Sequence, residues 1–262
     1  MRKPFIIILV IAALIALAYV SQGSRFFAPG SSKYELPKEV GPQTTSPQTP
    51  PPQITSPTPQ VPTKAVNLAV PFSPQAPYGD WSLPYQEACE EMSAFLVHAF
   101  FARIDVTPKL ADQAVRDIGA WEQKTFGYYE HTTAAETAQI LKQYFGYRQV
   151  DVLYDITIND IKDQLRAGRP VIVPLAGRLI GNPYYQQPGP VYHMIVVKGF
   201  TEDGYFITND VGTKRGHNYL VSEKTLYSAI HDAPTGGDSW TTLSPERYIL
   251  TGRKAIIVVY PN

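Results

Sequence analysis

A proline-rich stretch sets the first limit on what this chain of 262 residues can fold into. From Ala28 to about Lys64 the sequence is dominated by Pro, Thr, Gln and Ser, and no periodic apolar face runs through it. Such a composition cannot bury a hydrophobic core, so we expect a disordered, partly polyproline spacer over residues 23–65. The folded part is then expected over residues 66–262, which is enough for one domain of ordinary size.

The N-terminus has the features of a membrane-targeting segment. A continuous apolar run extends from Phe5 to Val20, directly after two basic residues. The run is slightly short for a full span of roughly 20 residues, and Ala16-Leu17-Ala18 resembles a signal cleavage site. A transmembrane anchor over residues 1–22 and a cleaved signal are both open. We favour the anchor, because the apolar run continues past that site, and in either case the remainder is exported.

Charge and motif content exclude several functions. The formal net charge is zero and no basic stripe is present, so we expect no nucleic-acid partner. Five histidines and one cysteine lack the short spacings of a zinc site, and no phosphate-binding or dinucleotide-binding glycine motif occurs. We therefore expect neither a metal nor a cofactor.

The only cysteine, Cys89, lies near the start of a predicted helical run from Tyr85 to Arg103. Unsatisfied backbone N–H groups at a helix start favour a thiolate over a thiol, so this position suits a nucleophile. A lone cysteine in an exported chain cannot form an internal disulfide, and a stray thiol there is a liability. The alternative is a small apolar residue packed in the core.

Helical patterns come first in the folded part and strand patterns follow. The second predicted helix is expected to bury Leu110, Ala114, Val115 and Ile118. A capping box at Thr133 is expected to begin the third. This order predicts an α+β fold with a mostly antiparallel sheet. The further predicted helices lie over 107–123, 133–146, 158–167 and 223–230, and the strands over 149–154, 170–176, 192–200, 205–208, 219–221 and 255–260.

Two residues of the strand region complete a candidate site with Cys89. His193 interrupts an apolar strand, where burying an imidazole is unfavourable unless the ring is paired. Asp210 ends the next strand of a predicted hairpin, and neighbouring strands bring such positions within side-chain reach. A thiol nucleophile needs a base, and the base needs an orienting partner. Gln75 offers an amide for the oxyanion if its loop folds back over the helix start.

These residues lie in motifs that resemble a known family. The segments V-P-F-S-P-Q-A-P, A-C-E-E-M-S, Y-H-M-I-V-V-K-G-F and I-T-N-D are similar to those of papain-like cysteine peptidases. The resemblance is to the group of bacterial leader peptidases that process double-glycine bacteriocin precursors, in its stand-alone, exported branch. It covers roughly residues 66–260. It implies a papain-like fold in which Cys89 is the nucleophile, His193 the general base, Asp210 the orienting residue and Gln75 the oxyanion donor.

Two departures from the family pattern leave alternatives open. Many members have glycine after the nucleophile, where this chain has Glu90, whose carboxylate can raise the thiol pKa or contact substrate. Many also have N-D-P where this chain reads N-D-V-G-T, so Asn209 competes with Asp210 for the third role. Gln86 competes with Gln75 as oxyanion donor; we prefer Gln75, because Gln86 lies on the turn just before the nucleophile.

The predicted function is peptide-bond hydrolysis through an acyl-thioenzyme, on a peptide or protein substrate. Substrate contacts are expected from four aromatic residues, Trp81, Tyr184, Tyr185 and Tyr192. Alternatives on the same triad are a peptidoglycan amidase or endopeptidase and an acyl transferase. A further alternative, from a different class, is a catalytically silent peptide-binding module.

Overall fold

The computed structural model describes residues 35–43, 64–237 and 244–261. Within these ranges no helix has both the length and the apolar character needed to cross a membrane. The predicted anchor over residues 1–22 lies outside the described residues, as does most of the predicted spacer.

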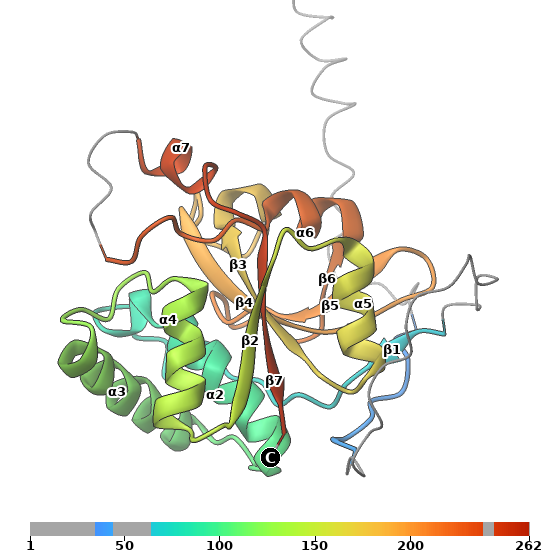
Figure 1. Cartoon of the computed structure of the whole chain (residues 1–262), viewed down its shortest axis with the longest axis horizontal. Coiled ribbons are helices and arrows are strands. Elements are labelled where there is room, and N and C mark those ends of the chain that lie inside the picture. Colours follow the sequence, from blue (N-terminus) through green and yellow to red (C-terminus); the bar gives the residue numbers. More distant parts are fainter. Residues whose placement is uncertain (1–34, 44–63, 238–243, 262) are drawn as a thin grey trace, which may run out of the picture. The chain divides into compact units, whose positions relative to one another are not determined.

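An antiparallel sheet forms the centre of the fold (Figure 1). Its strands follow the order β2-β7-β3-β4-β5-β6, and β1 pairs with the far end of β4. All strand pairings are antiparallel. The strands are β1 (Val66–Asn67), β2 (Gln149–Tyr154), β3 (Val171–Ala176), β4 (Tyr192–Phe200), β5 (Tyr205–Asn209), β6 (Tyr219–Ser222) and β7 (Ala255–Tyr260).

Strand β4 is buried along its whole length, between β3 and β5. Its register with β5 pairs Val196 with Asn209. Side chains alternate between the two faces of a sheet, so Asp210, one residue beyond β5, falls on the same face as His193. The two positions are diagonal neighbours, which lie within reach of longer side chains. The strand register therefore brings together the histidine and the aspartate of the candidate site.

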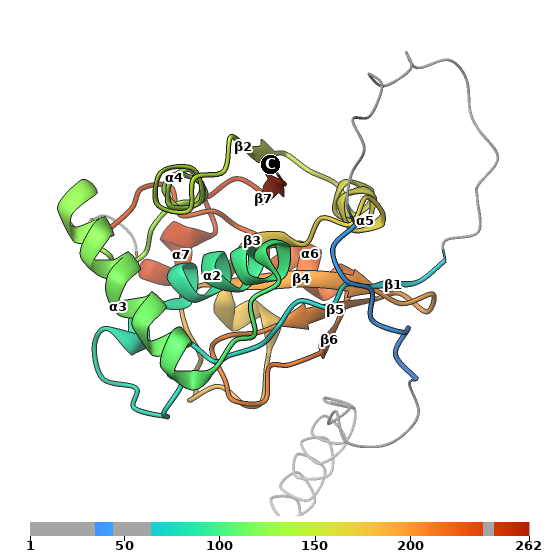
Figure 2. The same cartoon turned by 90° about the horizontal axis from the view of Figure 1, so that it is seen from below.

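Helices cover the sheet, and the longest of them pack against one another. Figure 2 shows α2 running alongside β4, with α3 outside it, and residue contacts join both pairs. Helix α2 is buried on nearly all sides, with even its first-turn acidic residues enclosed. The helices are α2 (Cys89–Ala102), α3 (Pro108–Thr125), α4 (Ala134–Gln139), α5 (Ile158–Arg166), α6 (Glu223–Ala229) and α7 (Pro245–Ile249). Helices on an antiparallel sheet confirm the predicted α+β class.

Local sequence signals determine where most helices begin. The hydroxyl of Thr107 accepts from the Leu110 N–H at the start of α3, and Thr133 with Glu136 forms the predicted capping box of α4. The predicted inner face of α3 is wrong at Leu110, which is 45% exposed, whereas its neighbour Ala111 is buried. Val115 and Ile118 are buried as predicted, and Ala114 is half-buried. Helix α3 packs on α2, and its buried face begins with Ala111 in place of Leu110.

A short N-terminal segment within the predicted spacer lies against the domain. Val40 bridges to Leu68 beside β1, and the Asn67 side chain donates to the Pro37 carbonyl at 2.9 Å. Glu39 forms an ion pair with Lys198 of β4, whose side chain is fully buried. Burial lowers the pKa of Lys198, and Glu39 opposes that fall. The segment therefore provides the countercharge of a cation inside the fold.

Removing that countercharge is expected to destabilise the domain. Glu39→Ala removes both the countercharge and the acceptor, and it leaves Lys198 with Asn218 Oδ1, at 2.8 Å, as its remaining partner among the described residues. Hydrogen bonds to charged groups contribute about 1.5–3 kcal/mol, so the free energy of unfolding should fall by about that amount. Denaturant unfolding measures the change, with Lys38→Gln at the neighbouring exposed position as control. Equal stability of the two variants would contradict the role given to Glu39.

Candidate active site

The nucleophile candidate lies at the first position of a buried helix. Helix α2 begins at Cys89, and the residue before it, Ala88, provides no side-chain cap. The backbone N–H groups of the first turn therefore have no capping partner at the end of the helix that carries the thiol. One turn later, Ser93 Oγ donates to the Met194 carbonyl of β4 at 3.3 Å. This contact fixes the start of α2 against the strand that carries His193.

His193 and Asp210 form a buried pair. His193 Nε2 lies 2.9 Å from Asp210 Oδ1, and the two side chains are 2% and 0% exposed. With Nε2 bonded to Asp210, the remaining ring nitrogen, Nδ1, makes no hydrogen bond to any described residue and is available to a thiol or a substrate. A neighbouring carboxylate fixes both the tautomer and the orientation of an imidazole.

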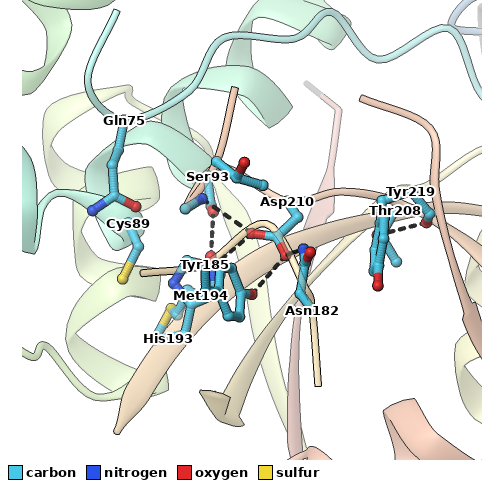
Figure 3. A network of polar contacts seen from close by, with 12 residues as sticks. Gln75, Cys89, Ser93, Asn182, Tyr185, His193, Met194, Thr208, Asp210 and Tyr219 are labelled. Atoms are coloured by element: carbon cyan, nitrogen blue, oxygen red, sulfur yellow. Dashed lines mark hydrogen bonds and ion pairs between the residues drawn. The ribbon is translucent and has the colours of Figure 1, made fainter. Parts of the chain in front are cut away.

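Asp210 is itself held by three donors (Figure 3). Asn182 Nδ2 donates to Oδ2 at 2.8 Å, and the Tyr185 hydroxyl donates to the same oxygen at 2.6 Å. The Gly212 N–H donates to Oδ1 at 3.0 Å. Burial acts to raise the pKa of Asp210, but His193 and these side-chain hydrogen bonds outweigh it and leave the pKa below its ordinary value. The carboxylate is therefore kept ionised beside the imidazole.

Gly212 is required where it stands. A Cβ on this residue would lie 2.9 Å from both Cε1 and Nε2 of His193. The Tyr185 ring meets the His193 ring edge-on, with centroids 5.6 Å apart. The imidazole is thus confined on two sides, and any residue larger than glycine at position 212 would have to displace it.

A cleft of about 990 Å³ brings the candidate residues together. Cys89 and His193 both line it, although no hydrogen bond joins their side chains among the described residues. Gln75, Trp81, Tyr184 and Tyr192 also line the cleft, together with Lys214, Arg215, Gln86 and Gln187. No group of three or more His, Cys, Asp or Glu side chains in the described part of the chain is arranged to hold a metal ion.

The thiol itself is bonded to a carboxyl group. Cys89 Sγ donates to Glu90 Oε2 at 2.9 Å. Burial raises the pKa of the Cys89 thiol well above its ordinary value, Glu90 raises it further, and the backbone amide of Met194 acts in the opposite direction. The expectation that the helix start lowers this pKa is wrong for the resting site, because burial and the adjacent carboxyl group outweigh the helix.

The two glutamines considered for the oxyanion role have other partners. Gln75 is buried, and its Nε2 donates to the Tyr85 and Gln86 carbonyls at 2.9 Å each, while its Oε1 has no hydrogen-bond partner among the described residues. Gln86 is exposed, and its Nε2 donates to Glu87 at 2.7 Å. Both residues line the cleft. Both N–H groups of Gln75 are occupied, so Gln75 must give up one of its carbonyl bonds before it can donate to an oxyanion, whereas Gln86 uses one of its two N–H groups in its bond to Glu87.

The two rivals for the orienting role face different ways. Asp210 contacts His193, whereas Asn209 Nδ2 donates to the Val70 and Pro71 carbonyls at 3.1 and 3.0 Å. Asn209 therefore holds the segment that leads to Gln75.

The four aromatic residues expected to contact substrate divide into two groups. Trp81 and Tyr184 line the cleft with accessible rings, and Arg215 lies over the Tyr184 ring at 5.0 Å. Tyr192 lines it too, but its hydroxyl bonds inward to the Thr132 carbonyl. Tyr185 is buried behind His193, and its hydroxyl donates a hydrogen bond to Asp210.

Sequence reasoning missed Asn182, which is 1% exposed and bonded to Asp210. It belongs to the Gly- and Pro-rich loop after β3, where an asparagine is ordinary, so only its burial distinguishes it.

Comparisons with known proteins identify the family. The Peptidase_C39 like family matches residues 67–234, which is more than half of the chain and includes Cys89, His193 and Asp210. Among solved structures, a protein from Bacillus anthracis described as a C39-like peptidase is similar at 16% identity, with a TM-score of 0.45, over 75% of this chain and 98% of that chain. No curated protein matches the sequence significantly. The resemblance to papain-like cysteine peptidases is confirmed, and the chain belongs to the Peptidase_C39 like family.

Proposed function

We propose that the domain is a cysteine peptidase that hydrolyses peptide bonds through Cys89, His193 and Asp210. One observation carries the proposal: His193, whose imidazole lies 2.9 Å from the buried Asp210 carboxylate, lines a cleft together with the sole thiol of the chain, which begins a helix. Membership of a C39-like peptidase family supports the same chemistry. The roles of the individual residues are our assignment.

The reaction begins with transfer of the thiol proton to His193 Nδ1, the ring nitrogen not bonded to Asp210. The thiolate attacks the carbonyl carbon of the scissile bond, and a tetrahedral oxyanion forms. His193 then gives its proton to the leaving amine, which leaves an acyl-thioenzyme. Water, deprotonated by the same imidazole, attacks the thioester and releases the acid and the thiol.

The oxyanion needs donors beside Cys89. The backbone N–H groups in the first turn of α2 lack intrahelical partners and carry partial positive charge. Gln75 is our candidate for the side-chain donor. It lines the cleft, and giving up its bond to one of the Tyr85 and Gln86 carbonyls would release one N–H.

The cleft also suggests how a peptide is held. Trp81 and Tyr184 present flat apolar surface, and Lys214 and Arg215 line the same cleft with two positive charges. Aromatic faces and long cationic side chains suit an extended chain with an acidic or carboxylate group in reach. We assign Trp81, Tyr184 and Tyr192 to substrate contact and Tyr185 to the support of Asp210.

We further propose that the enzyme acts outside the cytoplasm, tethered to the membrane. This rests on sequence alone: the apolar run and preceding basic residues within 1–22, and the proline-rich composition of the spacer. Cleavage of the segment would give a secreted enzyme with the same site.

Labelling by an electrophilic peptide tests the nucleophile and the substrate class together. A peptide with a chloromethyl ketone should modify the protein once, at Cys89, and protection by unlabelled peptide should follow binding in the cleft. Cys89→Ala and Cys89→Ser should lose labelling and peptidase turnover while retaining the thermal midpoint. Turnover that survives in Cys89→Ala would refute the assignment. Peptide binding without turnover in the wild type would favour a silent binding module.

Replacing Asp210 tests the orienting role against its neighbour. Asp210→Asn removes the charge that stabilises an imidazolium, so kcat/KM should fall by about 10²- to 10⁴-fold. Asn209→Ala removes two hydrogen bonds to the 70–71 segment and should lower stability more than it lowers kcat/KM of the folded fraction. Kinetics paired with thermal unfolding separate the two. The reverse pattern would transfer the role to Asn209.

A further inference from the structure

The carboxyl group nearest the thiol has no part in the mechanism above. Glu90 directly follows Cys89 in the first turn of α2 and is 0% exposed. Its Oε2 accepts the thiol proton in a hydrogen bond of 2.9 Å, and its Oε1 has no hydrogen-bond partner among the described residues. The proton that His193 must receive is therefore directed, in the resting site, at Glu90.

The surroundings of Glu90 are acidic. Glu91 and Glu122 are also 0% exposed, and their carboxyl groups interact with each other rather than with a cation. Glu87, whose Oε2 lies 3.7 Å from His131 Nε2, adds a further carboxylate, and the buried Tyr192 phenol faces the same region. No ion pair of the described residues brings a lysine or arginine to Glu90. An ionised Glu90 would be a buried charge without a countercharge.

The consequence for the thiol depends on the protonation of Glu90. When the carboxyl is ionised, a thiolate beside it would be a second negative charge in the same buried turn, so the thiol keeps its proton. When the carboxyl is neutral, its O–H can donate to the sulfur and stabilise a thiolate. The same contact thus opposes ionisation of the thiol when Glu90 is ionised and favours it when Glu90 is neutral.

We propose that Glu90 is a positioning residue that controls the ionisation of Cys89: its carboxyl must carry a proton for the thiol to become a thiolate. The inference rests on the proposed role of Cys89 as the nucleophile. Such control by Glu90 sets an upper pH limit on thiolate formation, and therefore on the activity proposed for the exported enzyme.

The direction of the pH effect follows from the burial of this group. Burial raises the pKa of Glu90 to about 8, and Glu87 acts in the same direction. Below about pH 8 the Glu90 carboxyl is mostly neutral, so replacing it by the neutral amide of glutamine changes the thiolate fraction of Cys89 little. Above that pH, the Glu90–Cys89 pair of the wild type loses its first proton mainly from Glu90. The negative charge on Glu90 then opposes ionisation of the thiol, so the thiolate fraction stops rising. A variant without the carboxyl keeps gaining thiolate as the pH rises.

The experiment is alkylation of the full chain by iodoacetamide from pH 6 to pH 9.5. Cys89 is the only cysteine, so the rate of modification reports this thiol alone. We expect wild type and Glu90→Gln to react within about twofold of each other at pH 6. The wild-type rate should level off near pH 8, and the variant should be about tenfold faster at pH 9, because one pH unit is a tenfold change in thiolate.

Glu91→Gln is the matched control, because it removes a buried carboxyl of the same turn that does not bond to the thiol. Its profile should stay close to that of the wild type, because Glu91 raises the pKa of the thiol less than Glu90 does. If Glu90→Gln does not fold, Glu90→Ala and the levelling of the wild-type rate near pH 8 provide the same test. A ratio of variant to wild type that is constant across pH, or the same divergence in Glu91→Gln, would overturn the proposal.

A His193→Ala variant keeps this result distinct from the proposed function. If the alkylation rates of Glu90→Gln and wild type do not diverge at high pH, only the role of Glu90 is refuted. Peptidase turnover that does not depend on His193 refutes the catalytic assignment, even where the divergence persists.

Discussion

The hydrogen bond between His193 and Asp210 is the interaction on which the rest of the site depends. An imidazole in the middle of a buried strand is unfavourable unless its polar atoms are paired, and Asp210 satisfies one of them. Asp210 in turn needs compensation for its own burial, and it receives donors from Asn182, Tyr185 and Gly212. The loop after β3 and the turn after β5 are thereby held in place by one carboxylate.

The protonation of the Cys89 thiol is determined by opposing effects. A helix start favours an anion, yet the resting thiol is buried and bonded to Glu90, and these two effects raise its pKa. In the mechanism we propose, Cys89 is a protonated nucleophile whose activation needs both a proton acceptor, His193, and a neutral neighbour, Glu90. A thiol that is buried and protonated in this way is less open to oxidation than an exposed thiolate.

The sequence predicts the elements of this site better than its electrostatics. The strand over Tyr192–Phe200 and the hairpin that follows it are local patterns, and their register alone places Asp210 near His193. The capping box at Thr133 is equally local. The helix face at Leu110 was misassigned because it depends on which partner α3 packs against. Burial of Glu90, the inward role of Tyr185 and the contribution of Asn182 arise from tertiary packing, which no spacing in the sequence records.

The central claim is that one sulfur and one imidazole act as a unit across the cleft. The most direct measurement is the rate at which an electrophilic peptide modifies Cys89 at neutral pH in wild type and in His193→Ala, with thermal unfolding to verify the fold of both. The account predicts a rate at least about 100-fold lower in the variant, with both proteins folded. Equal rates in two folded proteins would contradict it, because Cys89 would then react without the imidazole.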